Sequence, residues 1–400
     1  MHNETLTKNM KIAFIGQKGI PAKGGGVERH VEELATRLAK LDNEVYVYSR
    51  KHYTGYNESK YQGVNLIYLP ALKTKNLEAI THSFLATLDA LRRGFDVIHY
   101  HGVGPSTLAW LPRLLKRKTK IMTTFHCRDQ FHQKWSLLAK LYLRFGEWAT
   151  AKFPHQTITV SNSIKKVCVE QYNSPTAERI PNGVMIKEYS GSETLNKFGL
   201  KPGKYIMTCA RLVRHKGIHY LIEAFDKLKA ANPESLKGLK LAIVGDSVYT
   251  DQYVKELKDM AEKNDDIVFT GFQSGKTLAQ LFQNAYLYAH PSEAEGLPIT
   301  VLEAMKYGKA VLVSDIPENV EAFAGYGYMF ASGNVEDLQY KLELLLANAE
   351  LVKEVGQKAK KYVSVNYNWE DIVKKTLELY QEVPAAQAKS LSLAESLQKS

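Results

Sequence analysis

The chain has 400 residues, of which 44% are hydrophobic and 24% are charged. This balance excludes a disordered chain, and the length favours two globular domains over one. Its three cysteines, Cys127, Cys168 and Cys209, lie far apart and outside any CxxC pattern. That arrangement argues against a disulfide framework or zinc knuckle and favours a reducing, cytoplasmic location. No apolar run reaches the roughly 18–20 residues that span a bilayer, and the polar N-terminus lacks the core of a signal peptide.

The first half of the chain alternates apolar runs with helical patterns. KIAFI at Lys11–Ile15 precedes a glycine-rich loop and a helix whose apolar residues recur with helical spacing between Val27 and Leu41. Further strands are predicted at Val45–Tyr48, Val64–Leu69, Val97–Tyr100, Ile121–Phe125 and Thr157–Val160, with helices at 76–93, 104–117, 134–151 and 161–171.

The pattern restarts after IPNGV at Ile180–Val184. A second series of strands is predicted at Tyr205–Cys209, Leu241–Val244, Ile267–Thr270, Leu287–His290, Ala310–Val313 and Tyr328–Phe330, again with helices between them. A final helix is expected at Glu370–Glu382.

This alternation predicts an α/β protein with two Rossmann-like, doubly wound parallel sheets facing across a cleft. We expect an N-terminal domain at 10–190, a hinge near 184–200 and a C-terminal domain at 191–366. A C-terminal helix at 367–383 would cross back to the first domain, and residues 1–9 and 384–400 would be loosely ordered. Ligands of such sheets bind beyond the carboxyl ends of the strands, so the site residues are sought there.

The segment His290–Gly308 (HPSEAEGLPITVLEAMKYG) places two carboxylates around a predicted helix start. Proline is tolerated in the first turn of a helix, so the helix should begin near Leu297 or Pro298, after Glu295 and before Glu303. The free amides and dipole of a helix N-terminus favour phosphate, and flanking carboxylates accept hydrogen bonds from sugar hydroxyls. Alternatively, one carboxylate only favours the helix start and the other is solvated.

The segment Cys209–Gly217 (CARLVRHKG) places Arg211 and Lys216 in the loop after a predicted strand. Fixed cations aimed at the charge of a departing diphosphate lower the barrier to its departure. Arginine offers a bidentate fork and lysine a compact charge. The alternative is that both residues are ordinary surface charges.

The loop GQKGIPAKGGGVERH ends in Gly24, Gly25 and Gly26, which would let backbone approach a ligand closely. Its glycine spacing does not match the dinucleotide-binding fingerprint. The second predicted strand also ends in Arg50, where an NAD enzyme would need an acid.

Three histidines lie at the carboxyl ends of predicted strands. His126 follows one strand in TTFHCRD, and His99 and His101 end another in IHYHG. Each either orients a substrate hydroxyl or is hydrogen-bonded structure.

The chain contains no D-x-D pair to hold a Mg²⁺–diphosphate. We therefore expect no metal and no other cofactor, with Arg211, Lys216 and the helix terminus in the place of a metal. Phosphate-binding GxxxxGK[ST] and nucleophile GxSxG motifs are also absent from the sequence.

In combination, these segments resemble the family 4 retaining glycosyltransferases of the GT-B fold over residues 10–383. The likeness rests on GGGVERH, the histidine after TTF, VSNS, IPNGV, ARLVRHKG, VGDS, FTGF and EAEGLPITVLEAM. The segment GQKGIPAKGGGVERHVEEL is also similar to a rhamnosyltransferase-type subgroup. One departure is Pro298, where many members have a second glycine, so the backbone donors to phosphate could differ in detail.

The resemblance implies transfer of a sugar from a nucleotide-diphosphate donor with retention of configuration. It implies that Arg211 and Lys216 bind the donor diphosphate. Glu295 would contact the transferred sugar and help to stabilise its cationic transition state, and His126 would lie beside that sugar. These four residues are the predicted catalytic set.

The same resemblance implies the remaining contacts. Glu303 would hold the ribose hydroxyls and Phe272 would lie near the base. Glu28 and His101 would lie near the acceptor. Further predicted donor contacts are Gly25, Gly26, Asp246, Gly296, Leu297, Pro298 and Ile299.

The rhamnosyltransferase-like segment suggests a glycan or lipid-linked saccharide acceptor, in cell-surface polysaccharide synthesis. Residues 1–190 hold 28 Lys+Arg against 15 Asp+Glu, whereas the remainder holds 25 against 27. The basic half could rest peripherally on the anionic inner face of the cell membrane, or be a solvated face without a partner. The candidate contact residues are Leu111, Arg113, Leu114, Leu115, Lys116, Arg117, Lys118 and Lys120. Residues 135–148 could join them, but a buried core helix is favoured there.

Two alternatives stay open. A nucleotide-sugar epimerase could share this fold, whereas a glycogen-type phosphorylase would need a longer chain and a pyridoxal-phosphate lysine. A non-catalytic protein that binds nucleotide sugars or nucleic acid is a different class. The intact set of Glu295, Glu303, Arg211 and Lys216 argues against lost catalysis, and no nucleic-acid reader motif is found.

Overall fold

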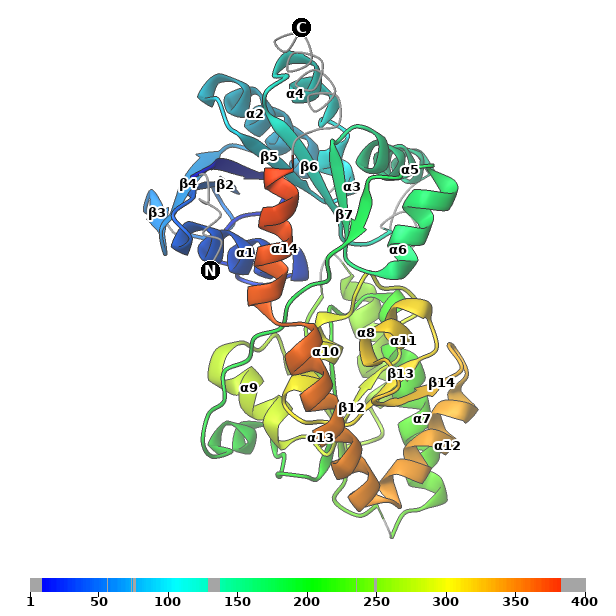
Figure 1. The fold of residues 1–400 in the computed structure, drawn as a ribbon. Helices are drawn as coiled ribbons and strands as arrows, with labels where there is room; N and C mark the ends of the chain where they lie inside the picture. The colour runs from blue at the N-terminus through cyan, green and yellow to red at the C-terminus, as the bar shows by residue number, and fades with distance from the viewer. Residues whose placement is uncertain are drawn as a thin grey trace, which may run out of the picture. The chain divides into compact units, whose positions relative to one another are not determined.

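The chain divides into two compact units, one of Met1–Asn182 with Trp369–Ser400 and one of Gly183–Asn368 (Figure 1). The computed structural model describes residues 9–382 except residues 56, 73, 75–76, 129–136, 235 and 248–249. The predicted boundary at 190/191 falls slightly after the division at Asn182. The tails expected to be loosely ordered lie almost wholly outside the described residues.

The first unit is built on an eight-stranded sheet of order β3-β4-β2-β1-β5-β6-β7-β8. Its strands are β1 (Lys11–Ile15), β2 (Glu44–Arg50), β3 (Lys60–Tyr61), β4 (Val64–Leu69), β5 (Val97–His101), β6 (Lys120–Phe125), β7 (Gln156–Thr159) and β8 (Ala177–Arg179). All neighbours are parallel except β3 and β4, which form an antiparallel pair. The sequence did not predict β3 and β8, because these short polar edge strands carry no periodic apolar signal.

Helices cover both faces of this sheet. They are α1 (Gly26–Lys40), α2 (Glu78–Arg93), α3 (Val103–Ser106), α4 (Trp110–Leu115), α5 (Leu137–Lys152), α6 (Asn162–Lys166) and α14 (Trp369–Gln381), and a π-helical turn, Val167–Gln171, extends α6. The single helix predicted at 104–117 is wrong, since the chain breaks there into α3 and α4. Pro112 cannot donate to the Leu108 carbonyl, which accepts a tighter bond from the Leu111 amide at 3.1 Å instead.

Alternate residues of the central strands form two cores. Ile12 and Phe14 of β1 pack with α1 and α14, while Ala13 and Ile15 pack on the opposite face with α2. Figure 1 shows α1 and α14 together on one side of the sheet, although they come from opposite ends of the chain. This two-sided burial is expected of a parallel sheet.

Lys120 ties α14 to the sheet. Its ammonium group donates to the carbonyl of Leu379 and, at 2.6 Å, to that of Glu382, two carbonyls at the open end of the helix. The side chain is only 7% exposed. The prediction that Lys120 belongs to an exposed basic surface is therefore wrong.

The second unit has a six-stranded, all-parallel sheet of order β11-β10-β9-β12-β13-β14. Its strands are β9 (Tyr205–Cys209), β10 (Lys240–Val244), β11 (Ile267–Gly271), β12 (Leu287–His290), β13 (Val311–Ser314) and β14 (Tyr328–Phe330), each within one residue of its predicted bounds. In both sheets the strand order reverses once, beside β1 and β5 in the first and beside β9 and β12 in the second. These points are where open α/β sheets bind ligands.

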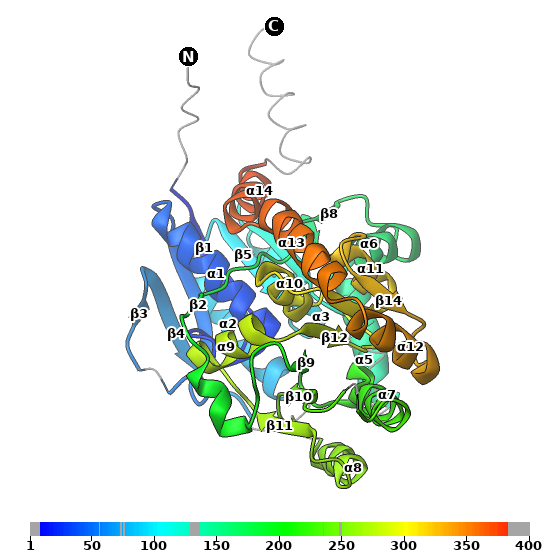
Figure 2. The ribbon, with the colours of Figure 1, turned by 90° about the horizontal axis from the view of Figure 1, so that it is seen from below.

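The helices of the second unit are α7 (Ile218–Ala231), α8 (Asp251–Ala261), α9 (Gly275–Asn284), α10 (Ile299–Lys306), α11 (Pro317–Phe323), α12 (Val335–Leu346) and α13 (Ala349–Asn366). Figure 2 shows α13 running past α10. Gly356 permits this close approach, because a Cβ at that position would lie 2.2 Å from the carbonyl oxygen of Gly308. Among the described residues, no helix is both long enough and apolar enough to cross a membrane.

The contact between α3 and α5 offers a matched stability test. A Cβ at Gly146 would lie 2.7 Å from the carbonyl oxygen of Val103, whereas a Cβ at Gly104 meets no atom within 4 Å. We expect Gly146→Ala to lower the free energy of unfolding by about 1–3 kcal/mol, because α3 must move. Gly104→Ala should be neutral or stabilise by up to about 1 kcal/mol.

Denaturation followed by tryptophan fluorescence measures this difference in the first unit, since all four tryptophans, at 110, 135, 148 and 369, belong to it. Equal unfolding midpoints for the two variants would contradict the packing described.

Candidate active site

Two loops of the second unit meet where its strand order reverses. The loop after β9 and the loop after β12 are joined by the amide of Glu293, which donates to the His215 carbonyl at 2.8 Å. Gly217 has φ +66°, and a Cβ there would lie 1.9 Å from the carbonyl oxygen of Pro291. Only glycine therefore fits at this crossing of the two loops.

A buried three-residue contact lies at this crossing. Lys216 Nζ is 2.5 Å and His290 Nε2 is 2.7 Å from the same oxygen of Glu295, Oε1. The side chains of Lys216, Glu295 and His290 are only 12%, 9% and 3% exposed. The structure thus brings together Lys216 and Glu295, both predicted, and adds His290, which was not predicted as a site residue.

The charge of Glu295 is fixed by its neighbours. Burial alone would raise the pKa of this carboxyl group, but the positive charge of Lys216 and the hydrogen bond from His290 outweigh burial and hold the pKa well below its usual range. An ammonium group has three donors, so Lys216 keeps N–H groups for a second ligand. The contact is a preformed charged centre.

The N-terminus of α10 adjoins this centre in the chain. The helix begins at Ile299, just after the predicted start, because Pro298 has extended backbone (ψ 93°) and serves as the N-cap residue. The first helical bond is made by the Val301 amide to the Pro298 carbonyl at 3.1 Å. The amides of Ile299 and Thr300 precede it and point along the helix axis, as in a phosphate site.

The other predicted donor residues follow neighbouring strands. Arg211 is exposed in the same loop as Lys216, and its neighbour Leu212 donates from its amide to the Asp246 carbonyl at 3.0 Å, which joins the loops after β9 and β10. Phe272, just after β11, is 56% exposed. Glu303 is buried within α10, at 5% exposure. The predicted donor residues thus follow the carboxyl ends of four strands, β9 to β12, which lie along one edge of this sheet. Gly296 and Leu297, next to Glu295 in the chain, are buried.

Three histidines of the first unit lie beside the point where the strand order of its sheet reverses. His101 ends β5, His126 follows β6, and His30 comes from α1. His101 Nδ1 lies 3.0 Å from His126 Nε2, and the ring centroid of His30 is 5.0 Å from that of His126. His30 was not predicted as a site residue. The sequence pattern that could have identified it is its spacing of three residues from Val27 and four from Leu34, which places His30 on the apolar face of α1.

Burial keeps these three imidazoles neutral. It lowers the pKa of His30 to about 4, with a partial offset from the Asn182 side chain, and it lowers the pKa values of His101 and His126 well below the usual range. Nε2 of His101 has no hydrogen-bond partner within the described residues, and neither ring nitrogen of His30 makes a hydrogen bond of ordinary geometry there. In the described part of the chain, these three side chains are the one group of histidine, cysteine or acidic residues whose spacing could hold a metal ion.

His99 differs from these neighbours. Its Nδ1 pairs with the Tyr380 hydroxyl at 2.6 Å and its Nε2 with the Thr124 hydroxyl at 2.7 Å. Both ring nitrogens are therefore used in structure, and the structural interpretation of this histidine holds.

Glu28 turns towards the glycine loop. Its Oε1 accepts a hydrogen bond from the Lys18 amide at 3.2 Å, and a Cβ on Gly25 would lie 2.2 Å from Oε2. Gly25, at φ +101°, precedes α1, and Gly26 begins that helix. Glu28 thus stabilises the glycine-rich loop through its hydrogen bond with Lys18. Its predicted contact with an acceptor stays a prediction.

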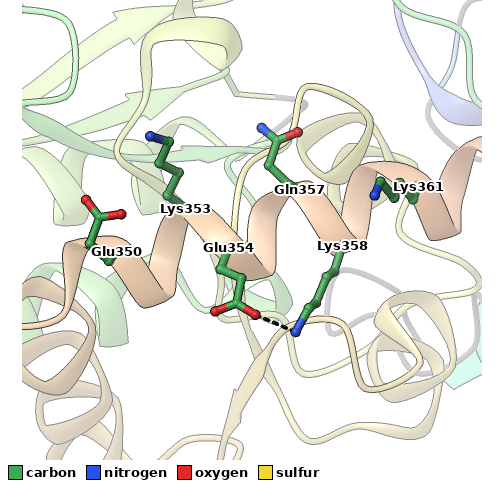
Figure 3. Close-up of a pocket in the computed structure, with 6 residues that line it drawn as sticks. All are labelled: Glu350, Lys353, Glu354, Gln357, Lys358 and Lys361. Carbon is green, nitrogen blue, oxygen red and sulfur yellow. Dashed lines mark ion pairs between the residues drawn. The ribbon is translucent and has the colours of Figure 1, made fainter.

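A surface hollow along α13 is not a candidate site. Six polar side chains of this one helix line it: Glu350, Lys353, Glu354, Gln357, Lys358 and Lys361 (Figure 3). Glu354 and Lys358 pair at 2.6 Å, and both are more than half exposed. Within the described parts of the chain, no second element contributes to the lining, so the hollow is the outer face of a solvated helix.

Sequence comparison assigns each unit to a known family. The pattern of the family described as Glycosyltransferase Family 4 matches residues 24–188, and that of Glycosyl transferases group 1 matches residues 192–362. An uncharacterized glycosyltransferase of Methanocaldococcus jannaschii is 26% identical over 93% of this chain and 98% of its own length. Spore coat protein SA of Bacillus subtilis is 24% identical over 93% of this chain and 100% of its own length.

Solved structures show the same architecture. Sucrose-phosphate synthase from Thermosynechococcus elongatus matches with a TM-score of 0.80 at 20% identity, covering 93% of this chain and 98% of that one. Anabaena HepE, solved in complex with UDP and glucose, matches with a TM-score of 0.76 at 20% identity, covering 94% of this chain and 100% of that one.

The two parallel-sheet units and these likenesses define an α/β protein of the GT-B fold. The chain belongs to the family 4 glycosyltransferases, as its motifs predicted.

The depressed pKa of Glu295 predicts how the stability of the second unit depends on pH. A carboxyl group whose pKa is lowered by folding contributes stability that is fully present above its unfolded pKa, about 4.3, and is lost as the pH falls towards the folded value. At pH 7 we expect Glu295→Gln to cost about 3 kcal/mol, because it leaves Lys216 buried without its partner. Below about pH 4.3 the difference from the wild type should shrink.

Hydrogen exchange of β9 and β12 in both proteins, measured across this pH range, checks the prediction. A difference that stays constant as the pH falls would show that Glu295 is not held ionised by its neighbours.

Proposed function

We propose that this glycosyltransferase moves a sugar from a nucleotide-diphosphate donor to a glycan or lipid-linked saccharide, with retention of configuration, in cell-surface polysaccharide synthesis. The observation that carries the proposal is the buried contact of Lys216, Glu295 and His290 beside the start of α10. Two matching structures support it: Anabaena HepE was solved with UDP-glucose, and WaaG is described as a glycosyltransferase involved in lipopolysaccharide biosynthesis.

Donor binding follows from the residues along the carboxyl edge of the second sheet. Lys216 and Arg211 supply positive charge to the diphosphate, and the amides of Ile299 and Thr300 supply neutral donors. Glu303 accepts hydrogen bonds from the ribose, and exposed Phe272 offers an aromatic face to the base. Asp246, together with Gly296, Leu297 and Pro298, completes the wall of this donor site.

Catalysis requires charge to be stabilised at both ends of the breaking bond. As the bond from the anomeric carbon to the phosphate oxygen breaks, electrons pass to the diphosphate, where Lys216 and Arg211 stabilise them. Glu295, kept ionised, stabilises the positive charge left on the sugar. The departing phosphate then accepts the proton of the acceptor hydroxyl, which bonds to the anomeric carbon on the same face and so retains its configuration.

The first unit supplies neutral groups in this proposal. His126 binds a hydroxyl of the transferred sugar, and His101 and Glu28 contact the acceptor. The glycine loop at Gly25 and Gly26 lets backbone approach the ligand. No metal or other cofactor takes part in the transfer, because the sequence has no D-x-D pair and the protein's own cations face the diphosphate.

Substitution of the charged centre tests the proposal. We expect Lys216→Met and Glu295→Gln each to lower kcat by about 10²–10³, because each removes a charge that acts in the transition state. Arg214→Ala is the matched control, since Arg214 lies in the same loop but pairs with Glu256 at the surface and is 43% exposed. Its transfer rate should be unchanged.

Transfer is measured with a nucleotide sugar and saccharide acceptor in the presence of EDTA. Wild-type rates in Lys216→Met, or a strict requirement for Mg²⁺, would contradict this mechanism. Release of epimerised sugar without any acceptor would show instead an epimerase of the same fold.

An exposed apolar and basic surface supports peripheral contact with the inner face of the cell membrane. On α4, Trp110, Leu114 and Leu115 are 42%, 67% and 61% exposed. The exposed cations Arg113, Lys116, Arg117 and Lys118 accompany them in sequence. Apolar side chains fringed by cations suit an anionic lipid surface.

Helix α5 adds a second apolar stripe. Leu141, Phe145 and Trp148 are 55%, 47% and 39% exposed at helical spacing, while Leu143 and Ala149 are buried. The preference for a buried core helix at 135–148 is therefore wrong for one face of α5; residues 135 and 136 lie outside the described residues. The first unit therefore has exposed apolar side chains on two helices, α4 and α5, that could contact lipid.

Vesicle co-sedimentation tests this contact. The chain should bind anionic vesicles more tightly than zwitterionic ones, and the double variant Leu114→Ser, Leu115→Ser should bind them at least about tenfold more weakly. Leu344→Ser, which changes an apolar side chain 40% exposed on α12 of the second unit, is the control. Equal binding of wild type and double variant would contradict the assignment.

A further inference from the structure

Three buried histidines from separate elements of the first unit point their nitrogens towards one another. His30 lies on α1, His101 ends β5 and His126 follows β6, and they are 2%, 1% and 8% exposed. One ring nitrogen from each lies within 4.8 Å of those of the other two. Residues far apart in the sequence thus converge at the point where ligands of such a sheet bind.

The spacing of these nitrogens is close to that of a metal site. A tetrahedral zinc ion bonds histidine nitrogen at about 2.0–2.1 Å, which places neighbouring ligand nitrogens about 3.3 Å apart. His101 Nδ1 and His126 Nε2 are 3.0 Å apart. The nitrogens of His30 and of the other two rings lie within 4.8 Å of one another, so closing to this spacing requires the nitrogens to approach by about 1.5 Å at most.

The unpaired nitrogens need a ligand. Buried polar atoms without a hydrogen bond are rare and costly, yet Nε2 of His101 has no hydrogen-bond partner within the described residues, and neither nitrogen of His30 makes a hydrogen bond of ordinary geometry there. The buried side chain of Asn182, in the same unit, is a polar neighbour of His30, and hydrogen bonding to it partly offsets the effect of burial on the pKa of His30. His99, whose nitrogens are both bonded, shows that this interior can satisfy a histidine where no ligand is needed.

We propose that His30, His101 and His126 form a binding site for one divalent transition-metal ion, zinc being the best suited. Three imidazoles leave a fourth position open to water or to another ligand, as in open zinc sites. Imidazole favours Zn²⁺, Co²⁺, Ni²⁺ and Cu²⁺ over Mg²⁺, which prefers oxygen ligands. All three proposed ligands belong to the first unit, whereas the residues proposed to bind the diphosphate belong to the second.

Binding needs no net loss of protons. A neutral imidazole carries one N–H and one lone pair, and one proton now lies between His101 Nδ1 and His126 Nε2. On binding, that proton moves to the outer nitrogen of the same ring, so each histidine turns a lone pair to the metal. Packing of Phe14 on His101, with centroids 5.4 Å apart, and of Trp369 on His30, at 5.5 Å, holds the rings in place.

Cobalt titration of the metal-free, full-length protein tests the site directly. We expect one equivalent of Co²⁺ to bind, with the visible absorption of a four- or five-coordinate ion, and to be displaced by Zn²⁺ but not by excess Mg²⁺. Absence of these bands in the wild type would overturn the proposal, whatever the variants do.

Substitutions of single histidines test which side chains bind the ion. His30→Gln and His126→Gln should each weaken Co²⁺ binding at least 100-fold. His99→Gln is the matched buried control and His219→Gln, on α7, a control in the other unit; both should bind one equivalent. Circular dichroism confirms that each variant is folded. Wild-type affinity in folded His30→Gln would overturn the proposed ligand set.

A second consequence rests on the proposed function. Because His101 and His126 are assigned to the acceptor and the transferred sugar, one equivalent of Zn²⁺ should lower the transfer rate, and a chelator should restore it. Zinc uptake with an unchanged rate would contradict those histidine roles but not the metal site. Failure of uptake would contradict the metal site alone.

Discussion

The buried ion pair of Lys216 and Glu295 is the interaction on which the account of this enzyme depends. Two charges taken out of water cost more than they commonly return, so such a pair is weak evidence of stability. Here the pair lies between the loops that follow β9 and β12, where the strand order of the second sheet reverses. Gly217 and the bond from Glu293 to His215 hold the two loops together. Burying these two charges costs desolvation free energy and adds little stability. A buried ion pair held in a rigid crossing of loops is therefore best explained by a role in binding or catalysis.

The two sheets offer different chemistry at corresponding edges. The second presents a lysine, an arginine, an ionised glutamate and the start of a helix, all suited to a charged nucleotide. The first presents neutral imidazoles and a glycine loop, suited to hydroxyl groups or to a transition metal. A glycosyltransferase needs both kinds of surface, because its donor is highly charged and its acceptor groups are sugar hydroxyls.

Much of this could be predicted from the sequence. Regular alternation of apolar runs and helical patterns located every central strand, because strands buried on both faces leave a strong apolar signal. Motif position also placed Lys216 and Glu295 at one sheet edge, because the carboxyl ends of parallel strands lie together. The short strands β3 and β8 were not predicted, since two or three residues are too few to show a periodic pattern of apolar side chains.

Other features could not be predicted from the sequence and were found only in the structure. The break between α3 and α4, the buried position of Lys120 and the exposed face of α5 depend on tertiary packing, which overrides local pattern. His30 and His290 were missed as site residues because a single histidine has no periodic signal, and its partners come from distant elements. The convergence of His30, His101 and His126 can be seen only when α1, β5 and β6 are assembled.

The most direct test of the central claim is a crystal structure of this chain with a bound nucleoside diphosphate. The account predicts phosphate oxygens within about 3 Å of Lys216 Nζ and of the amide nitrogens at Ile299 and Thr300, with Glu295 still beside Lys216. A diphosphate bound elsewhere, with Lys216 making no contact to phosphate, would contradict it.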